Sequence, residues 1–278
     1  MIVATDFSKT AHNACMYAAD MAAKISAELV LFHVIPIPLA VSEIPVEVDL
    51  GPEQEEAVLI IRELQKQIAS RVHGRVATSM SVHVGTFFYE LNKLCERIDP
   101  FLVIMGSQGS SAVEQTAFGE HSVYTMKHLS WPVITIPPGA WFGAVKTIGL
   151  ACDFEHVAQT VPVEQIAVFV RSLGAKLHIL NIDKKISPNP DTVFESALLQ
   201  DLFHDLKPTY DLLAGEKDDR AIIEFAEKNK IDLLIVLPKR HSLIDRLLHQ
   251  SHTRQFVLYS SVPVLALHKE SNKHTTVS

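Results

Sequence analysis

The chain has 278 residues, of which 47% are hydrophobic, so it is long enough for two domains of ordinary size, each with a packed core. Its formal net charge of −7 argues against general nucleic-acid binding, which usually needs a basic face. It has no apolar run long enough to cross a membrane, and no leader in which a charged start precedes an apolar core.

Short apolar segments, each bounded by turn residues, recur along the chain and predict its strands. Continuous apolar runs of this length are typical of strands that are buried on both faces of a parallel sheet. The expected strands are residues 2–7, 29–35, 79–84, 102–106 and 132–137 in the first half, and residues 148–154, 177–182, 210–214, 233–238 and 263–268 in the second. The first strand of each half ends in Asp-Phe and the last begins with Pro-Val, so the second half repeats the first.

Helical patterns lie between these strands. Ser8 can cap a helix whose apolar stripe begins at Ala11 and ends at Ile25. Further helices are expected at residues 52–74 and 88–99, and at residues 161–174, 191–206 and 219–229 in the second half. This alternation predicts the α/β class, with two tandem doubly wound domains, each a five-stranded parallel sheet with helices on both faces. We divide the chain into domains at 1–140 and 141–278, with a seam at Pro138–Lys146.

The three cysteines, Cys15, Cys95 and Cys152, are far apart in the sequence and odd in number. Each has apolar neighbours, so they do not predict a disulfide framework. We expect reduced core residues and a cytoplasmic location.

Ligands of such sheets bind beyond the carboxyl ends of the strands, where the strand order reverses. Asp6 closes the first strand and Gly106 closes the fourth, and Gly109 and Gly119 follow. A carboxylate there can accept hydrogen bonds from a base amine or a ribose hydroxyl, and glycines can let backbone N–H groups turn toward an anion. The spacing suits a nucleotide, with the base near the first strand and the phosphates between Gly109 and Gly119. A glycine-rich surface loop without a ligand is the alternative explanation.

Four segments of the first half share their pattern with one known family. They are the opening "IVATDFS", the second strand "LFHVI", the stretch "HVGTFFYEL" and the closing "HLSWPVITIPP". The nucleotide motif of that family is Gly, two residues, Gly, nine residues, Gly, then Ser or Thr, and Gly106, Gly109 and Gly119 have this spacing. On these grounds the chain resembles the universal stress proteins, over nearly all of its first half and, with fewer matches, over its second half to about His268.

The resemblance implies a strand order of 3-2-1-4-5 in each domain, and ATP binding in some members but not in others. It implies that Asp6 meets the base and the ribose, that Val34 meets adenine through its backbone, and that the three glycines line the phosphates. Ser107 and Ser122 complete the candidate set as nearby hydroxyls. ATP, with Mg²⁺ as an accompanying ion, is therefore the candidate ligand of the first domain alone. Glu120 departs from the motif, because it stands where a Ser or Thr hydroxyl should contact phosphate, and a carboxylate repels phosphate at close range.

The second half departs further from the motif. Aligned with "GSQG" it reads "PKRH" at residues 238–241, and Ser251 and His252 take the places of Gly119 and the hydroxyl residue. Asp153 is kept as the counterpart of Asp6. Because proline cannot donate an N–H and side chains would fill the phosphate space, we interpret the second site as degenerate. Its basic residues form either a solvated loop or a side-chain anion site: Lys239, Arg240, Arg246 and Arg254.

No catalytic arrangement can be argued from residue order alone. His241, Asp245, His249 and His252 have the spacing of a zinc-binding helix, but the family has a loop here, so no metal site is predicted. We interpret the chain as a non-enzymatic, stress-response module that binds or senses a nucleotide and acts through an unidentified protein partner, without nucleic-acid or membrane partners. Two alternatives stay open: a module for a non-nucleotide small molecule or anion, and a weak ATPase.

The final strand of each half, Pro132–Ile136 and Pro263–Leu267, is apolar enough to be an aggregation hazard if its edge stayed open. The resemblance implies dimers that pair these strands edge to edge. We therefore expect the two strands to pair with each other, antiparallel, within one chain, as an intrachain pseudo-dimer. A homodimer through other faces stays open.

Overall fold

The computed structural model describes residues 1–37, 50–107, 121–152, 154, 156–183, 190–214, 219–238 and 252–269. Within these residues the strands form one sheet, in the order β3-β2-β1-β4-β5-β10-β9-β6-β7-β8. The strands of the first half are β1 (Ile2–Ala4), β2 (Leu29–Ile35), β3 (Thr78–Val84), β4 (Val103–Gly106) and β5 (Val133–Ile136). Those of the second half are β6 (Thr147–Ala151), β7 (Lys176–Asp183), β8 (Thr209–Ala214), β9 (Leu233–Val236) and β10 (Val264–Ala266).

Neighbouring strands are parallel within each half, and each half has its third strand at an outer end of the sheet and its fifth strand at the centre. The α/β class and the doubly wound parallel arrangement are thus as the sequence predicts. Every expected strand is present, and most are shorter than the apolar runs that predicted them.

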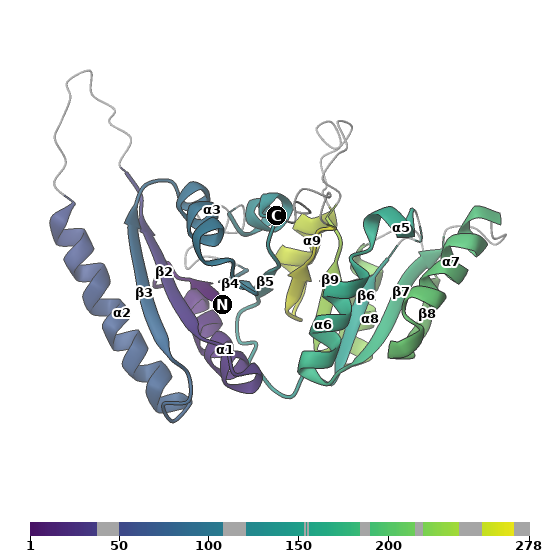
Figure 1. The fold of residues 1–278 in the computed structure, drawn as a ribbon, viewed down its shortest axis with the longest axis horizontal. Helices are drawn as coiled ribbons and strands as arrows, with labels where there is room; N and C mark the ends of the chain where they lie inside the picture. Colours follow the sequence, from purple (N-terminus) through teal and green to yellow (C-terminus); the bar gives the residue numbers. More distant parts are fainter. Residues whose placement is uncertain are drawn as a thin grey trace, which may run out of the picture.

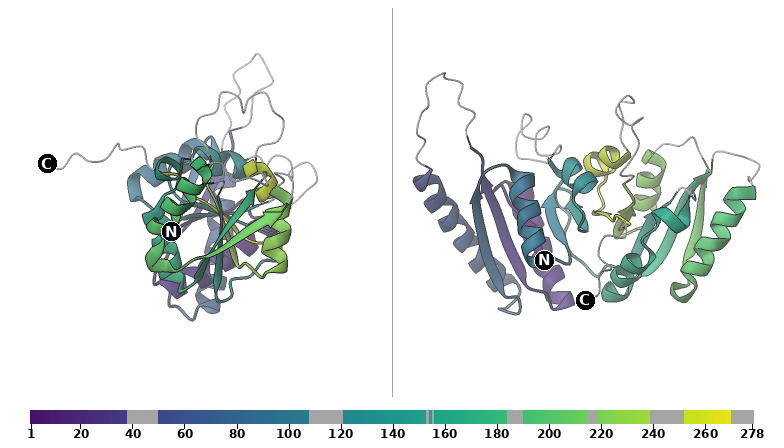
Figure 2. Two further views of the ribbon diagram at one scale, coloured as in Figure 1. Left: turned by 90° about the vertical axis from the view of Figure 1, so that its right-hand side faces the viewer. Right: turned by 45° about the horizontal axis from the view of Figure 1, so that its top comes forward.

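Helices cover both faces of the sheet (Figure 1 and Figure 2). They are α1 (Lys9–Ile25), α2 (Gly51–Arg71), α3 (Phe87–Ile98), α5 (Val157–Thr160), α6 (Val163–Leu173), α7 (Pro190–Leu202), the 3-10 turn η1 (His204–Leu206), α8 (Asp219–Lys228) and α9 (His252–Tyr259), and residues 121–128 are also helical. Helices α1, α2, α6 and α7 bury their apolar side chains in one core, on one face of the sheet. Helices α3, α8 and α9 and residues 121–128 bury theirs in a second core, on the other face. No helix in these parts of the chain is both long and apolar enough to span a bilayer.

The two halves meet where β5 pairs with β10, which is the antiparallel pair of the sheet. Ile134 lies opposite Leu265 and Thr135 opposite Val264, as expected for an intrachain pairing of the final strands. In Figure 1 these strands lie at the centre of the molecule, with α2 and β3 at one end and α7 and β8 at the other. The first core runs through both halves, and the rings of Phe101 and Phe169 meet across the junction with their centroids 4.8 Å apart. The outer edge of each final strand is therefore covered by the other half.

Local signals explain where the first helix of each half begins. The Ser8 hydroxyl accepts a hydrogen bond from the Ala11 N–H at 3.1 Å, so it caps α1 as the sequence predicts. In the second half the corresponding stretch is divided into α5 and α6, because Pro162 lies between them and cannot donate a backbone N–H. The helix predicted at residues 161–174 accordingly begins at Val163.

Candidate functional site

The end of β1 is shaped by a histidine of β2. The Thr5 N–H donates to the Phe32 carbonyl oxygen at 2.9 Å and so extends the ladder between the two strands. The Thr5 carbonyl oxygen then accepts a hydrogen bond from Nδ1 of His33 at 2.8 Å. Phe7 adopts a left-handed backbone with φ of 65° and stacks on the His33 ring, with the centroids 4.2 Å apart. Strand pairing therefore stops at Thr5, and the chain turns away from the sheet at Phe7.

This turn leaves the backbone of Val34 directed past the end of β1. The Phe32 carbonyl faces β1, whereas the Ile35 carbonyl accepts from Gly85 N–H on the other side at 3.0 Å. Because the backbone groups of successive strand residues alternate between neighbouring strands, the N–H and C=O of Val34 face the β1 side. The imidazole of His33 holds the Thr5 carbonyl, which a continued ladder would pair with the Val34 N–H. An adjacent donor and acceptor are thus presented beyond the end of β1.

Asp6 lies at the same strand end and is half-buried. Its Oδ1 accepts a hydrogen bond from the Ser8 N–H at 3.0 Å, which holds the carboxylate at the first turn of α1. The second carboxylate oxygen can accept from a hydroxyl or an amine of a ligand. The amino end of α1 adds unpaired N–H groups and partial positive charge beside it.

Gly106 ends β4, the other neighbour of β1. Its backbone is not in the left-handed region that favours glycine. A Cβ at this position would instead lie 3.0 Å from Thr10 Cγ2 and 3.4 Å from the Ala11 nitrogen, closer than side chains normally pack. The expectation that Gly106 supplies backbone freedom is therefore wrong, because what requires glycine here is the close approach of α1 to β4.

The two predicted serines lie around the end of β4. The Ser122 hydroxyl, which is buried, donates to the Gly106 carbonyl oxygen at 2.9 Å. The Ser107 N–H donates to the Ile136 carbonyl oxygen at 3.0 Å, so this N–H extends the sheet and is not offered to an anion. The Ser107 hydroxyl is also buried and has no hydrogen-bond partner among the residues that the structure describes. A ligand or water at this strand end would satisfy it.

The structure thus brings Gly106, Ser107 and Ser122 together at the end of β4, next to the end of β1, which leads into Asp6 and is paired on its other side with β2, the strand of Val34. Gly109, Gly119 and Glu120 lie outside the described residues, so the phosphate half of the site stays a prediction. The sequence-based prediction did not include His33 among the site residues. A histidine within the otherwise apolar strand "LVLFHVI" was the feature that could have indicated it.

The strand registers correct the alignment of the two halves. Val103 pairs with both Ile2 and Val133, and Leu234 pairs with both Gly149 and Val264. Val103 and Leu234 are therefore counterparts, which places Leu237 at the position of Gly106 and Pro238 at the position of Ser107. The alignment of Pro238 with Gly106 was wrong by one residue, because it was set by composition and not by strand pairing.

The same offset, continued along the sequence, pairs Gly119 with Gln250 and Glu120 with Ser251. It also pairs His121 with His252, the first described helical residue on each side. The second half therefore has the hydroxyl residue of the motif but none of its glycines. The residues between 239 and 251, and Asp153, lie outside the described part of the chain.

In the second half, a different side chain makes the corresponding hydrogen bond to the backbone carbonyl at the end of the first strand. The Cys152 N–H donates to the Leu180 carbonyl at 3.0 Å, and the Cys152 carbonyl accepts from Nδ2 of Asn181 at 2.8 Å. Asn181 is thus the counterpart of His33 and Cys152 that of Thr5. Phe154 has a φ of 53°, as Phe7 has 65°. The repeat extends to individual hydrogen bonds, although few residue identities are shared.

Clustered metal ligands are absent from the described residues, where no three His, Cys, Asp or Glu side chains gather around one point. Of the four residues with zinc-like spacing, for which no metal site is predicted, His241, Asp245 and His249 lie outside those residues. All three cysteines are buried and free, and burial raises the pKa of the Cys15 thiol to about 12. They are consistent with reduced core residues.

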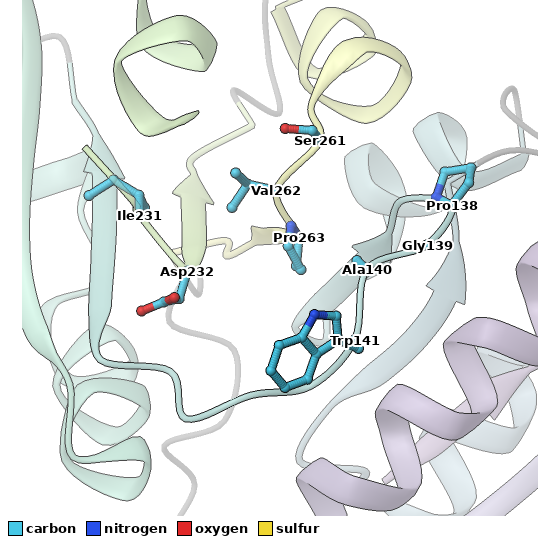
Figure 3. A pocket seen from close by; sticks show the side chains of 9 residues that line it. All are labelled: Pro138, Gly139, Ala140, Trp141, Ile231, Asp232, Ser261, Val262 and Pro263. Atoms are coloured by element: carbon cyan, nitrogen blue, oxygen red, sulfur yellow. The ribbon is translucent and has the colours of Figure 1, made fainter. Parts of the chain in front are cut away.

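An open pocket of about 350 Å³ lies at the seam between the halves (Figure 3). Three polar groups of this pocket form hydrogen bonds within the protein. Asp232 Oδ2 accepts from the N–H groups of Lys146 and Thr147 at 2.8 and 2.9 Å, and the Ser261 hydroxyl donates to Glu227 Oε1 at 2.6 Å. The Ala140 carbonyl accepts from Asn13 Nδ2 at 2.8 Å. These bonds fix the linker against both halves, so we interpret the pocket as a structural seam and not as the ligand site.

A family model described as "Universal stress protein family" matches residues 1–137 and 144–268. The chain is similar in structure to a universal stress protein from Archaeoglobus fulgidus, with a TM-score of 0.71 and 18% identity over 98% of this chain and 97% of the other.

Two solved structures from Pseudomonas aeruginosa are also similar over 96% of this chain and 91% of theirs. One is a functionally unknown protein with a TM-score of 0.58 and 13% identity, and the other is a putative universal stress protein with a TM-score of 0.57 and 12% identity. At these identities the likeness concerns the fold alone. None of the curated proteins matches the chain.

Proposed function

The chain belongs to the universal stress protein family as a tandem two-domain member, and from this premise we propose that it is a nucleotide-binding module. The proposed ligand is ATP, bound by the first domain alone. The proposed role is to sense or carry the nucleotide and to act through a protein partner, without catalysis on the bound nucleotide.

The observation that carries the proposal is the backbone of Val34 beside the carboxylate of Asp6. Adenine presents a donor and an adjacent acceptor on one edge, which complement the C=O and N–H that Val34 directs past the end of β1. The free oxygen of the Asp6 carboxylate can accept a hydrogen bond from a ribose hydroxyl. These two residues would hold the nucleoside.

The phosphates would extend toward the end of β4. The buried Ser107 hydroxyl lies there without a partner among the described residues, and the amino end of α1 provides a favourable potential for an anion. Gly109 and Gly119 are the expected sources of further N–H donors. Mg²⁺ would neutralise part of the phosphate charge, and this matters because Glu120 adds a negative charge to the motif.

The second domain has the matching hydrogen bond between Asn181 and Cys152, but its described residues lack the groups that we propose for phosphate. Leu237 stands at the position of Gly106, and Pro238, at the position of Ser107, has neither a hydroxyl nor an N–H. We therefore propose one nucleotide per chain at most.

The test is calorimetry with ATP, in the presence and absence of Mg²⁺, on the full chain. The Asp6→Asn variant should bind ATP at least about 5-fold more weakly, because it loses a hydrogen bond to an ionised acceptor. Asp153→Asn is the matched control in the second domain and should bind as the unmodified chain does. Binding at two equal sites, or equal losses in both variants, would contradict the proposal.

A second measurement separates the alternatives. The purified chain is denatured, and the released small molecules are identified by mass spectrometry. Released adenine nucleotide supports the proposal, and a different released compound supports a module for a non-nucleotide small molecule. Phosphate release from ATP that exceeds that of the Asp6→Asn variant would indicate a weak ATPase.

A further inference from the structure

A serine and a histidine of the outermost strand of the first half are hydrogen-bonded to each other, and a glutamate of α3 lies next to the histidine. Ser81 and His83 are two residues apart on β3, so their side chains share a face of the sheet. The Ser81 hydroxyl lies 2.7 Å from Nε2 of His83, and Nδ1 of the same ring lies 3.3 Å from Oε2 of Glu90 in α3. None of the residues of the candidate nucleotide site belongs to this group of three side chains.

The two ring nitrogens of His83 are placed as in a site that activates a serine. The Glu90 carboxylate, at ion-pair distance from Nδ1, favours the proton on that nitrogen. Nε2 is then an acceptor for the Ser81 hydroxyl and can take its proton when the oxygen attacks an electrophile. The order of atoms is nucleophile, base and orienting carboxylate.

The carboxylate is held in place by the shape of the strand end. A Cβ at Gly85 would lie 3.3 Å from both Cγ and Oε1 of Glu90, so this glycine leaves the space that the Glu90 side chain occupies. The Glu90 side chain is 12% exposed and the His83 side chain 27% exposed. The base is thus accessible to a substrate, while its partner is mostly shielded from water.

A pocket of about 360 Å³ between α3 and β3 reaches His83 and Glu90 of this group, and Ser81 lies behind His83, outside its lining. Its lining residues are His83, Glu90, Lys93, Leu94, Glu96 and Arg97. Lys93 and Arg97 are exposed, and neither forms an ion pair within the described chain. Glu90 and Glu96 line the same pocket, so its charges balance and its lining suits a small polar substrate.

The edge of the sheet supplies a donor next to the serine. The Leu29 N–H donates to the Ala77 carbonyl and the Gly85 N–H donates to the Ile35 carbonyl, so the odd-numbered residues of β3 pair with β2. The backbone groups of Val82 therefore face the open edge, since β3 is the outermost strand. This N–H follows the serine in the chain and can stabilise an oxyanion that forms on a bound acyl group.

We propose that Ser81, His83 and Glu90 form an acyl-transfer site that hydrolyses small polar esters. The Ser81 oxygen attacks the ester carbonyl, its proton passes to His83 Nε2, and the C–O bond to the alcohol breaks as that proton moves to the leaving oxygen. Water then attacks the acyl-serine and gives a proton to His83, which returns it to the Ser81 oxygen as the acid leaves. The products are one carboxylic acid and one alcohol.

The test uses the full chain and a fluorophosphonate probe. Attack by Ser81 forms a P–O bond and expels fluoride, and the proton leaves through His83. Peptide mapping should locate the label on Ser81 of the unmodified chain, and this measurement needs no variant. Label on other residues alone, or none, would overturn the proposal.

Steady-state hydrolysis of p-nitrophenyl hemisuccinate provides the second readout. Ser81→Ala should lose at least about 100-fold in kcat/KM, and Glu90→Gln at least about 10-fold with an unchanged unfolding midpoint. Ser79→Ala is the matched control, since it removes a hydroxyl from the same face of the same strand. Equal hydrolysis by the Ser81→Ala and Ser79→Ala chains would show that surface groups, and not this site, cleave the ester.

Discussion

The imidazole of His33 donates a hydrogen bond from Nδ1 to the backbone carbonyl oxygen of Thr5 at 2.8 Å. The bond ends the pairing of β1 with β2 and leaves the backbone of Val34 facing the candidate nucleotide site. In the second domain the amide of Asn181 makes the same contact with Cys152. The two halves thus use different side chains to hold the carbonyl at the end of the first strand. Replacing His33 with asparagine tests whether the two side chains are equivalent.

The first prediction concerns His33 and pH. Burial lowers the pKa of His33, against smaller opposing effects from the Thr5 carbonyl and the Asp6 charge. As the pH falls, His33 therefore binds a proton near pH 6.5 in the unfolded chain, but only at a lower pH in the folded chain. The free energy of unfolding that comes from neutral His33 is thus fully present above pH 6.5 and is lost as the pH falls. His33→Asn should fold, because Asn181 makes the same bond, and its stability should fall less steeply between pH 7 and pH 5.

Chemical denaturation at several pH values measures this difference. The difference in slope is at most about 1.4 kcal/mol per pH unit, the value for one proton. His12→Asn removes an exposed histidine from α1 and serves as the control. If the His12 and His33 variants follow the same pH profile, another group causes the acid sensitivity.

The second prediction concerns Gly106. Alanine there should destabilise the chain by about 1–3 kcal/mol, because its Cβ would lie 3.0 Å from Thr10 Cγ2 and 3.3 Å from the Thr10 backbone carbon. Gly143→Ala is the control, since its Cβ would lie 3.2 Å from the ring of Trp141, which is exposed and free to move. That change should cost less than about 0.5 kcal/mol. Similar losses in thermal unfolding of both variants would rule out close helix packing as the reason for Gly106.

The third prediction concerns Glu120. Its replacement by serine restores the hydroxyl of the nucleotide motif and removes a negative charge that the proposed site would hold near the phosphates. ATP binding should tighten by roughly 5-fold, which corresponds to about 1 kcal/mol in a partly solvated site. AMP binding should change less, because AMP does not carry the distal phosphates. Unchanged ATP affinity in calorimetry would mean that the Glu120 side chain points away from the ligand.

The fourth prediction concerns the pairing of the two final strands. A charge at Val133 or Val264 would be buried without a partner in the core shared by both halves, and should cost roughly 3–5 kcal/mol. The loss should not depend on protein concentration, because the pairing lies within one chain. A charge at exposed Val168 is the control.

Hydrogen exchange gives a direct readout of the same pairing. The amide groups of β5 and β10 should stay protected when the unmodified chain is diluted. Free exchange of both strands at low concentration would show that they are not paired within the chain.

Much of the architecture follows from the sequence itself. Buried parallel strands need continuous apolar runs, and Leu29–Ile35 is both an expected and an observed strand with the same ends. The Ser8 cap and the apolar stripe of α1 are local features, so they too are visible without coordinates. The pairing of the final strands could be inferred because two apolar edges must be covered.

The site depended on distances between residues that are remote in the chain. The spacing of the glycines gave the position of the motif, but not the reason for Gly106, which lies in the packing of α1 against β4. The alignment of the two halves from sequence was wrong by one residue, and the strand pairings of Val103 and Leu234 correct it. The contacts of Glu90 with His83 and of His33 with Thr5 could not be predicted from residue order, because side-chain contacts between elements depend on strand register and helix placement. Sequence determined the elements and the repeat because these arise from local periodicity, whereas only the tertiary structure decided which backbone and side-chain groups face a ligand.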